Sequence, residues 1–175
     1  GEKDVIRSIT RDDFTSYLKS LYSPTNMTIV LAGGISEKDG AALVEKYFGS
    51  MQKFKTVKAD RIKENQKKPQ VSIKHKKTEQ AHLAIGLRTV PLDSPERFAL
   101  SVLASILGGG MSSRLFSEVR EKRGLAYYVK SSSDHYTDAG SLTIAAGVDP
   151  KRIDEAIKTI IEELADLRDG RKLIS

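Results

Sequence analysis

The chain contains no cysteine, and this absence excludes disulfide bridges, thiolate metal ligands and a cysteine nucleophile. Tryptophan is also absent, and aromatic residues make up only 6% of the 175 residues. The apolar content of 39% is nevertheless enough for a globular core. No apolar run reaches the roughly 18 residues of a membrane span. The composition therefore predicts a globular domain without a membrane partner.

The first four residues do not resemble a signal peptide, because Gly1-Glu2-Lys3-Asp4 is charged and not apolar. A chain without targeting segment and without cysteine favours a cytoplasmic location.

Positive charge is concentrated in one segment of the chain. Residues 53–77 hold ten Lys or Arg and two Asp or Glu, a charge of +8, so the rest of the chain contributes −2 to the total of +6. Residues 53–69 have no hydrophobic period and are predicted to form a basic surface linker. The alternative is a binding stripe for anionic partners. No RNA-binding motif with interleaved aromatic residues accompanies the lysines, which favours the linker and no nucleic-acid partner.

Hydrophobic periodicity and capping residues predict an alternation of helices and strands. The expected helices start at the N-caps Thr10 and Ser36, at Ser94-Pro95 and at Asp149-Pro150, and the expected strands cover residues 26–32, 70–76, 81–88, 126–133 and 140–147. Residues 170–175 carry no predicted element. Adjacent strand pairs indicate an α+β fold with a largely antiparallel sheet and helices packed on one face, an α-β sandwich. Residues 1–175 are expected to form a single domain.

The most informative stretch runs from Gly108 to Tyr127. Gly108, Gly109 and Gly110 are predicted to form a backbone hinge, followed by a short amphipathic helix, a second glycine and a strand. Arg120 and Tyr127 would then lie on two adjoining rigid elements. The structural alternatives are a helix-end ion pair for Arg120 and a core position for the Tyr127 ring.

Arg114 lies four residues before Glu118, a spacing typical of a structural ion pair on one helix.

Catalytic motifs are missing from the chain. The three histidines, His75, His82 and His135, belong to no H-x-x-E-H or H-E-x-x-H pattern, so no zinc site is predicted. Ser132 or Ser133, Asp134 and His135 are consecutive on one strand, and their side chains should therefore alternate between faces and not converge. The triglycine lacks the lysine and serine or threonine of a phosphate-binding loop. By its own residues the chain is not expected to catalyse a reaction.

Several ordered motifs nevertheless resemble one enzyme family, the pitrilysin-like zinc peptidases or inverzincins. The motifs are Ile9-Thr10-Arg11-Asp12-Asp13-Phe14, Leu21-Tyr22-Ser23-Pro24-Thr25-Asn26-Met27, Gly108–Phe116, Val119–Tyr127 and Asp138-Ala139-Gly140-Ser141-Leu142. The resemblance covers nearly the whole chain.

This resemblance implies a metal-free companion of a zinc-bearing domain, excised from a longer endopeptidase that cleaves peptides or presequences. It implies that Arg120 and Tyr127 hold substrate and support the tetrahedral intermediate at a zinc held by that other domain. The implied partners are the catalytic domain and a peptide substrate, and a homo-oligomer is a separate expectation. The alternative is a non-enzymatic scaffold of the same fold, similar to the core proteins of the family.

Overall fold

The structure of the protein, a computed structural model, describes residues 1–170 and divides into two compact units. The first unit is Gly1–Asp60, and the second begins at Arg61. This boundary lies inside the segment 53–69 that the sequence predicts as a linker. The expectation that residues 1–175 form one domain stays a prediction.

The first unit is helical. Its elements are α1 (Lys3–Ser8), α2 (Arg11–Leu21), the 3₁₀ turn η1 (Pro24–Asn26) and α3 (Glu37–Phe48). The predicted N-caps are confirmed, because Thr10 accepts from the Asp13 amide and Ser36 accepts from the Asp39 amide. Asp13 also accepts from the Thr10 amide at 2.7 Å, which completes a capping box.

The strand predicted over residues 26–32 is not formed, so that prediction is wrong. After η1 the chain runs on without regular structure, and Val30 is 81% exposed. A strand needs a neighbouring backbone to satisfy its N–H and C=O groups, and the regular elements of this unit are all helices. The β-branched composition of the run favours an extended chain but supplies no partner.

The second unit is built on a three-stranded antiparallel sheet. Its strands are β1 (Ala81–Thr89), β2 (Ala126–His135) and β3 (Gly140–Val148), in the order β1-β3-β2. These three strands are confirmed with small changes at their ends. Because β3 lies between two antiparallel partners, it carries most of the buried sheet residues.

The strand predicted over residues 70–76 is also wrong, since this segment is extended but unpaired and Val71 is 85% exposed. The run offers only Val71 and Ile73 for burial, at about 1.5–3 kcal/mol each. Ordering its backbone costs about 1–2 kcal/mol per residue, so this small apolar face does not hold the segment on the sheet.

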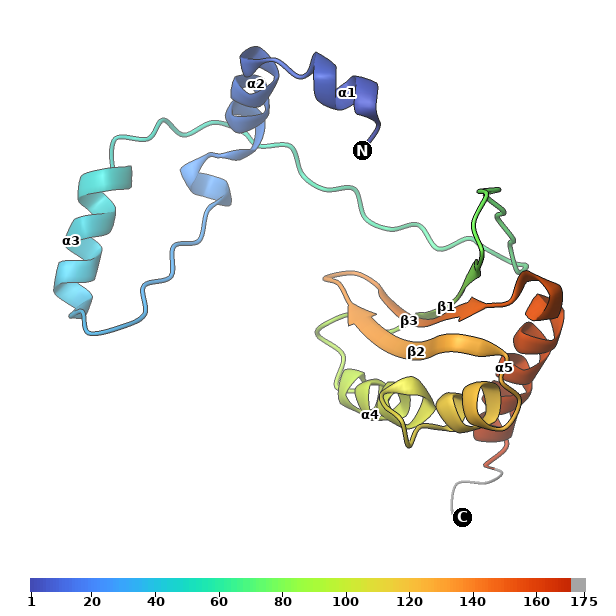
Figure 1. The fold of residues 1–175 in the computed structure, drawn as a ribbon. Helices are drawn as coiled ribbons and strands as arrows, with labels where there is room; N and C mark the ends of the chain where they lie inside the picture. The colour runs from blue at the N-terminus through green and yellow to red at the C-terminus, as the bar shows by residue number, and fades with distance from the viewer. Residues whose placement is uncertain (171–175) are drawn as a thin grey trace. The chain divides into compact units, whose positions relative to one another are not determined.

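Three helical elements cover one face of the sheet (Figure 1). They are α4 (Arg97–Gly108), the π-helix η2 (Phe116–Glu121) and α5 (Ile153–Arg168), which follows the 3₁₀ turn η3 (Pro150–Arg152). Among residues 1–170, no helix is long and apolar enough to cross a membrane. The predicted α+β fold, with helices on one face, is confirmed.

Two details of these helices differ from the prediction. Helix α4 begins at Arg97, because Ser94 caps a preceding turn by accepting from the Glu96 amide instead of capping the helix. In α5, the helical period predicts Ile161 in the core, but this residue is exposed, and the buried face is Ala156, Thr159, Ile160 and Glu163. No element is predicted for residues 170–175, and residues 171–175 of this segment lie outside the described residues.

The core lies between the helices and alternate residues of the strands. The fully buried side chains of this layer come from α4, from η2 and its flanks, from β3 and from α5: Leu107, Leu115, Val119, Leu125, Ile144, Val148 and Ile160. Burial of this one face leaves the opposite face of the sheet open. That face carries His82 and Ala84 from β1 and Tyr128 and Lys130 from β2, all exposed.

Candidate functional site

The triglycine lies where α4 meets β2. A Cβ atom on Gly108 would be 2.5 Å from the amide nitrogen of Ser131, so only glycine allows the helix end to approach this strand. The Ser131 hydroxyl donates to the Ala104 carbonyl at 2.6 Å and reinforces the same contact. A Cβ atom on Gly110, in contrast, would meet nothing within 4 Å. Hinge motion at Gly108, Gly109 and Gly110 stays a prediction.

Arg114 begins the segment after the triglycine and forms a long-range ion pair, while the predicted pair with Glu118 stays a prediction. Its guanidinium contacts the Glu163 carboxylate of α5 at 2.9 Å, with both side chains largely buried. Glu118 pairs with Lys122. The long-range pair fixes the η2 segment against α5, so the residues that follow are held on a rigid support.

The helix η2 that carries Arg120 has π geometry. The Lys122 amide donates to the Ser117 carbonyl at 2.9 Å, a bond that spans five residues. Gly124 then ends the helix in the left-handed region, with φ at +59°, and the chain passes directly into β2. Short π segments occur frequently at functional sites, because the extra residue turns a side chain out of its helical position.

Arg120 is exposed on this helix, and its guanidinium lies over the Phe116 ring at 4.9 Å from the ring centre. Within residues 1–170 no carboxylate forms an ion pair with Arg120, so the helix-end ion pair considered as the alternative is not formed. The aromatic contact orients the guanidinium and leaves its N–H donors available.

Tyr127 is the extra residue of a β-bulge in β2. Ala126 pairs with Val148 and Tyr128 pairs with Gly147, which leaves Tyr127 unmatched in the ladder. Its side chain is 60% exposed, so the alternative of a core aromatic is wrong. A bulge places a side chain where strict alternation would not, and such irregularities are common beside active sites.

The bulge was missed by sequence reasoning, although a signal was present. Ala126 and Val129 are both buried, and between them stand two residues where alternation allows one. The adjacent tyrosines Tyr127 and Tyr128 mark this break in the period of two. A second missed feature is the hydrogen bond between the Tyr128 hydroxyl and His82 Nδ1, at 3.2 Å.

The Ser133–His135 pair corrects a further expectation. Residues two apart on a strand share a face, and Ser133 Oγ lies 3.0 Å from His135 Nε2. His135 Nδ1 lies 2.8 Å from the Val90 carbonyl, which can only accept, so Nδ1 donates this hydrogen bond. Asp134 points to the other face, so the three residues form no triad. The pair ties the end of β2 to the loop after β1.

The histidines do not assemble a zinc site. His82 is engaged with Tyr128 and His135 with Ser133 and the Val90 carbonyl. Among residues 1–170 no group of three or more His, Cys, Asp or Glu is arranged to hold a metal ion. The described residues therefore do not fit zinc coordination.

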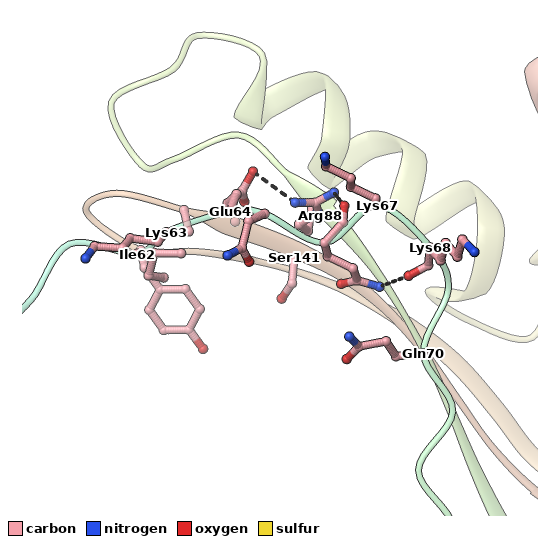
Figure 2. A pocket seen from close by; sticks show the side chains of 13 residues that line it. Ile62, Lys63, Glu64, Lys67, Lys68, Gln70, Arg88 and Ser141 are labelled. Atoms are coloured by element: carbon pink, nitrogen blue, oxygen red, sulfur yellow. Dashed lines mark hydrogen bonds and ion pairs between the residues drawn. The ribbon is translucent and has the colours of Figure 1, made fainter.

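A hollow lies at the other end of the open face, beside Arg88. The segment 62–68 covers it, and the Arg88 guanidinium pairs with Glu64 at 3.4 Å and donates to the Gln66 carbonyl at 3.1 Å. Figure 2 shows Lys63, Lys67 and Lys68 directed apart from one another. Because these ammonium groups do not converge, the arrangement favours a solvated basic linker over an anion cradle.

Comparison with protein families gives one match, which spans both units. Residues 8–172 match the family described as the peptidase M16 inactive domain. Curated relatives include an uncharacterised zinc protease of Bacillus subtilis, 38% identical over 97% of this chain and 41% of the relative. One of Mycobacterium leprae is 35% identical over 95% of this chain and 38% of the relative. The chain thus spans about two fifths of the length of these relatives.

Solved structures agree with this match. The crystal structure of a peptidase M16 inactive domain from Pseudomonas fluorescens is 28% identical, with a TM-score of 0.80 over 98% of this chain and 42% of that one. A conserved protein from Enterococcus faecalis shares the fold with a TM-score of 0.81 at 23% identity, over 99% of this chain and 41% of that one. Both the sequence motifs and the fold therefore place the chain among the inactive domains of the M16 zinc-protease family.

Proposed function

We propose that this chain is the substrate-holding, non-catalytic domain of a zinc endopeptidase that cleaves peptides or presequences. In this proposal Arg120 and Tyr127 reach a zinc site on another domain of the parent protein. The observation that carries the proposal is the placement of these two residues. Both are exposed, and both flank one tight turn that is anchored to the core on either side.

The chemistry of the two side chains suits this role. A guanidinium donates several hydrogen bonds in a fixed fork, and a phenol donates one. Both can stabilise negative charge that develops on a peptide carbonyl oxygen, without transferring a proton themselves. Such donors act best when they are held in place before the reaction. In this chain the Phe116 ring lies against the Arg120 guanidinium, and the β-bulge sets the place of Tyr127 in β2.

The zinc in this proposal belongs to the parent and not to this chain. The described histidines do not fit zinc coordination, while the curated relatives are named zinc proteases and extend well beyond the matched region. We therefore expect an H-x-x-E-H motif in another part of the parent. When bound there, zinc would polarise the scissile carbonyl and activate water. This chain would bind and orient the peptide.

Steady-state kinetics of the full-length protein test the proposal. Arg120→Lys, which displaces the donors, and Tyr127→Phe, which removes one, should each lower kcat on a fluorogenic peptide by about 10²–10³-fold. The thermal midpoint should hardly change, because both side chains are exposed.

Two matched variants serve as controls. Arg123→Lys changes a neighbouring exposed arginine, and Tyr136→Phe changes a tyrosine that is 61% exposed, close to the 60% of Tyr127. Both should keep normal kcat. Normal turnover in the Arg120 and Tyr127 variants would refute the role. The role would also be refuted if kcat of these variants fell only in proportion to a loss of folded protein.

The scaffold alternative makes a different prediction for the parent. A non-enzymatic scaffold would lack the H-x-x-E-H motif and would cleave no peptide as purified full-length protein with zinc. Reading the remaining sequence of the parent, followed by one peptide-cleavage assay, separates these two functions.

A further inference from the structure

The position of Tyr127 depends on where the ladder of β2 takes up its extra residue. Ala126 and Val129 both face the core, and the two tyrosines between them are exposed, Tyr127 at 60% and Tyr128 at 37%. A shift of pairing by one residue turns every side chain of a strand to the opposite face. Something must therefore hold the bulge at Tyr127 and prevent its displacement along β2.

Gly147 of β3 provides the space for such a restraint. A Cβ atom at this position would lie 2.5 Å from Cε1 and 2.9 Å from Cδ1 of Tyr128. The Tyr128 ring consequently lies across the central strand, over a residue without a side chain. No other residue type could occupy the position of Gly147 while the ring keeps this place.

His82 of β1 completes the contact on the far side of β3. Its Nδ1 shares a hydrogen bond of 3.2 Å with the Tyr128 hydroxyl, and the two rings are tilted by 32° with their centres 6.2 Å apart. His82, Gly147 and Tyr128 stand in one row of the sheet, since Gly147 pairs with both of the others. One aromatic side chain therefore joins all three strands on the open face.

We propose that Gly147, Tyr128 and His82 are positioning residues for Tyr127. With Tyr128 locked over Gly147 and bonded to His82, the extra residue of β2 falls at Tyr127, whose side chain must then turn away from the core. This inference rests on the proposed function, because the reacting peptide is what Tyr127 is positioned for. The positioning of Tyr127 by these residues can be tested without measuring catalysis.

Gly147→Ala in the full-length protein is the sharpest test, with Gly86→Ala as control. Gly86 lies on the same face of the sheet, and nothing lies within 4 Å of its Cβ position. Gly147→Ala should lower kcat by about 10- to 100-fold with little change in KM, the effect expected of a displaced reacting group. In a Tyr127→Phe background the same substitution should cause no further loss. Gly86→Ala should behave as wild type in both backgrounds.

A second pair of variants leaves the backbone untouched and guards against misfolding of Gly147→Ala. His82→Leu should reproduce part of the loss, whereas His82→Gln, which can still bond the phenol, should restore most of it. Full additivity of Gly147→Ala with Tyr127→Phe, or equal activity of the two His82 variants, would overturn the inference.

A readout without activity separates this inference from the proposed function. In the wild-type chain, nuclear Overhauser contacts should join Ala126 to Val148 and Tyr128 to Gly147, and Gly147→Ala should shift this register. A shifted register together with normal kcat in Tyr127→Phe would refute the proposed function but retain the positioning. An unshifted register in Gly147→Ala would refute the positioning.

Discussion

Alanine at Gly108 is predicted to destabilise the fold, whereas alanine at Gly110 is predicted to stabilise it. Gly108 ends α4 against β2, where an added Cβ would lie 2.5 Å from the Ser131 nitrogen and 2.9 Å from the Lys130 carbonyl carbon. Both are backbone atoms and cannot turn aside as a side chain would. At Gly110 nothing lies within 4 Å, and no left-handed conformation is required.

The magnitudes follow from these distances. An ordinary carbon contact is 3.4 Å or longer, so Gly108→Ala requires α4 to withdraw from β2 by roughly 1 Å. Such overpacking costs about 1–3 kcal/mol. Gly110→Ala should instead stabilise the fold by about 0.4–1 kcal/mol, because the unfolded chain loses conformational freedom.

Urea unfolding followed by far-ultraviolet circular dichroism measures this difference, since the chain has no tryptophan for fluorescence. With a slope of about 2 kcal/mol per molar, the midpoints of the two variants should differ by about 0.7–2 M, with unchanged slopes. A Gly108→Ala variant as stable as wild type would refute the close-packing account. So would a Gly110→Ala variant less stable than Gly108→Ala.

Two further predictions concern local features of the backbone and of a helix cap. Gly124→Ala should cost about 1–2 kcal/mol in the same assay, because φ at +59° strains a residue with a Cβ; Gly124→Asn should cost less, and equal costs would contradict this reasoning. The hydrogen bond from the Thr10 amide, and next that from its hydroxyl, lowers the pKa of Asp13 below its ordinary value of 3.8. A lowered pKa means that the cap stabilises α2 above about pH 4 and is lost as the pH falls through the pKa of the folded state. Nuclear magnetic resonance titration should give a pKa for Asp13 below its ordinary value. Asp13→Asn should abolish the contribution of this cap to the pH dependence of α2 stability.

Local signals in the sequence predicted the features that depend on neighbouring residues alone. The caps at Thr10 and Ser36 form as expected because a side-chain oxygen needs only the amide three residues later. Strand β2 has its partner β3 directly after it in the chain, whereas β1 was found from its alternating apolar residues although it pairs with β3 across α4, η2 and β2. The strands expected over residues 26–32 and 70–76 required a partner that composition cannot specify, and they are unpaired.

The assignment of Arg120 and Tyr127 to a site stays a prediction, and the backbone structure around them was not predicted. Arg120 and Tyr127 were found through their place in a family block, while the π-helix and the bulge that orient them arise from backbone hydrogen bonds. The contact of Tyr128 with His82 spans 46 residues and depends on the missing side chain of Gly147. Such three-strand contacts follow from register, which the sequence alone does not determine. Cytoplasmic location and homo-oligomer formation stay predictions.

The central claim is that Tyr127 touches the substrate of the parent enzyme. Site-specific photo-crosslinking tests it directly, with p-benzoylphenylalanine placed at position 127 in one full-length variant and at position 136 in another. Tyr127 and Tyr136 are equally exposed, at 60% and 61%, so exposure alone does not favour either position. A bound peptide substrate should be captured at position 127 and not at position 136. Capture at position 136 alone, equal capture at both positions, or none at position 127 would contradict the account.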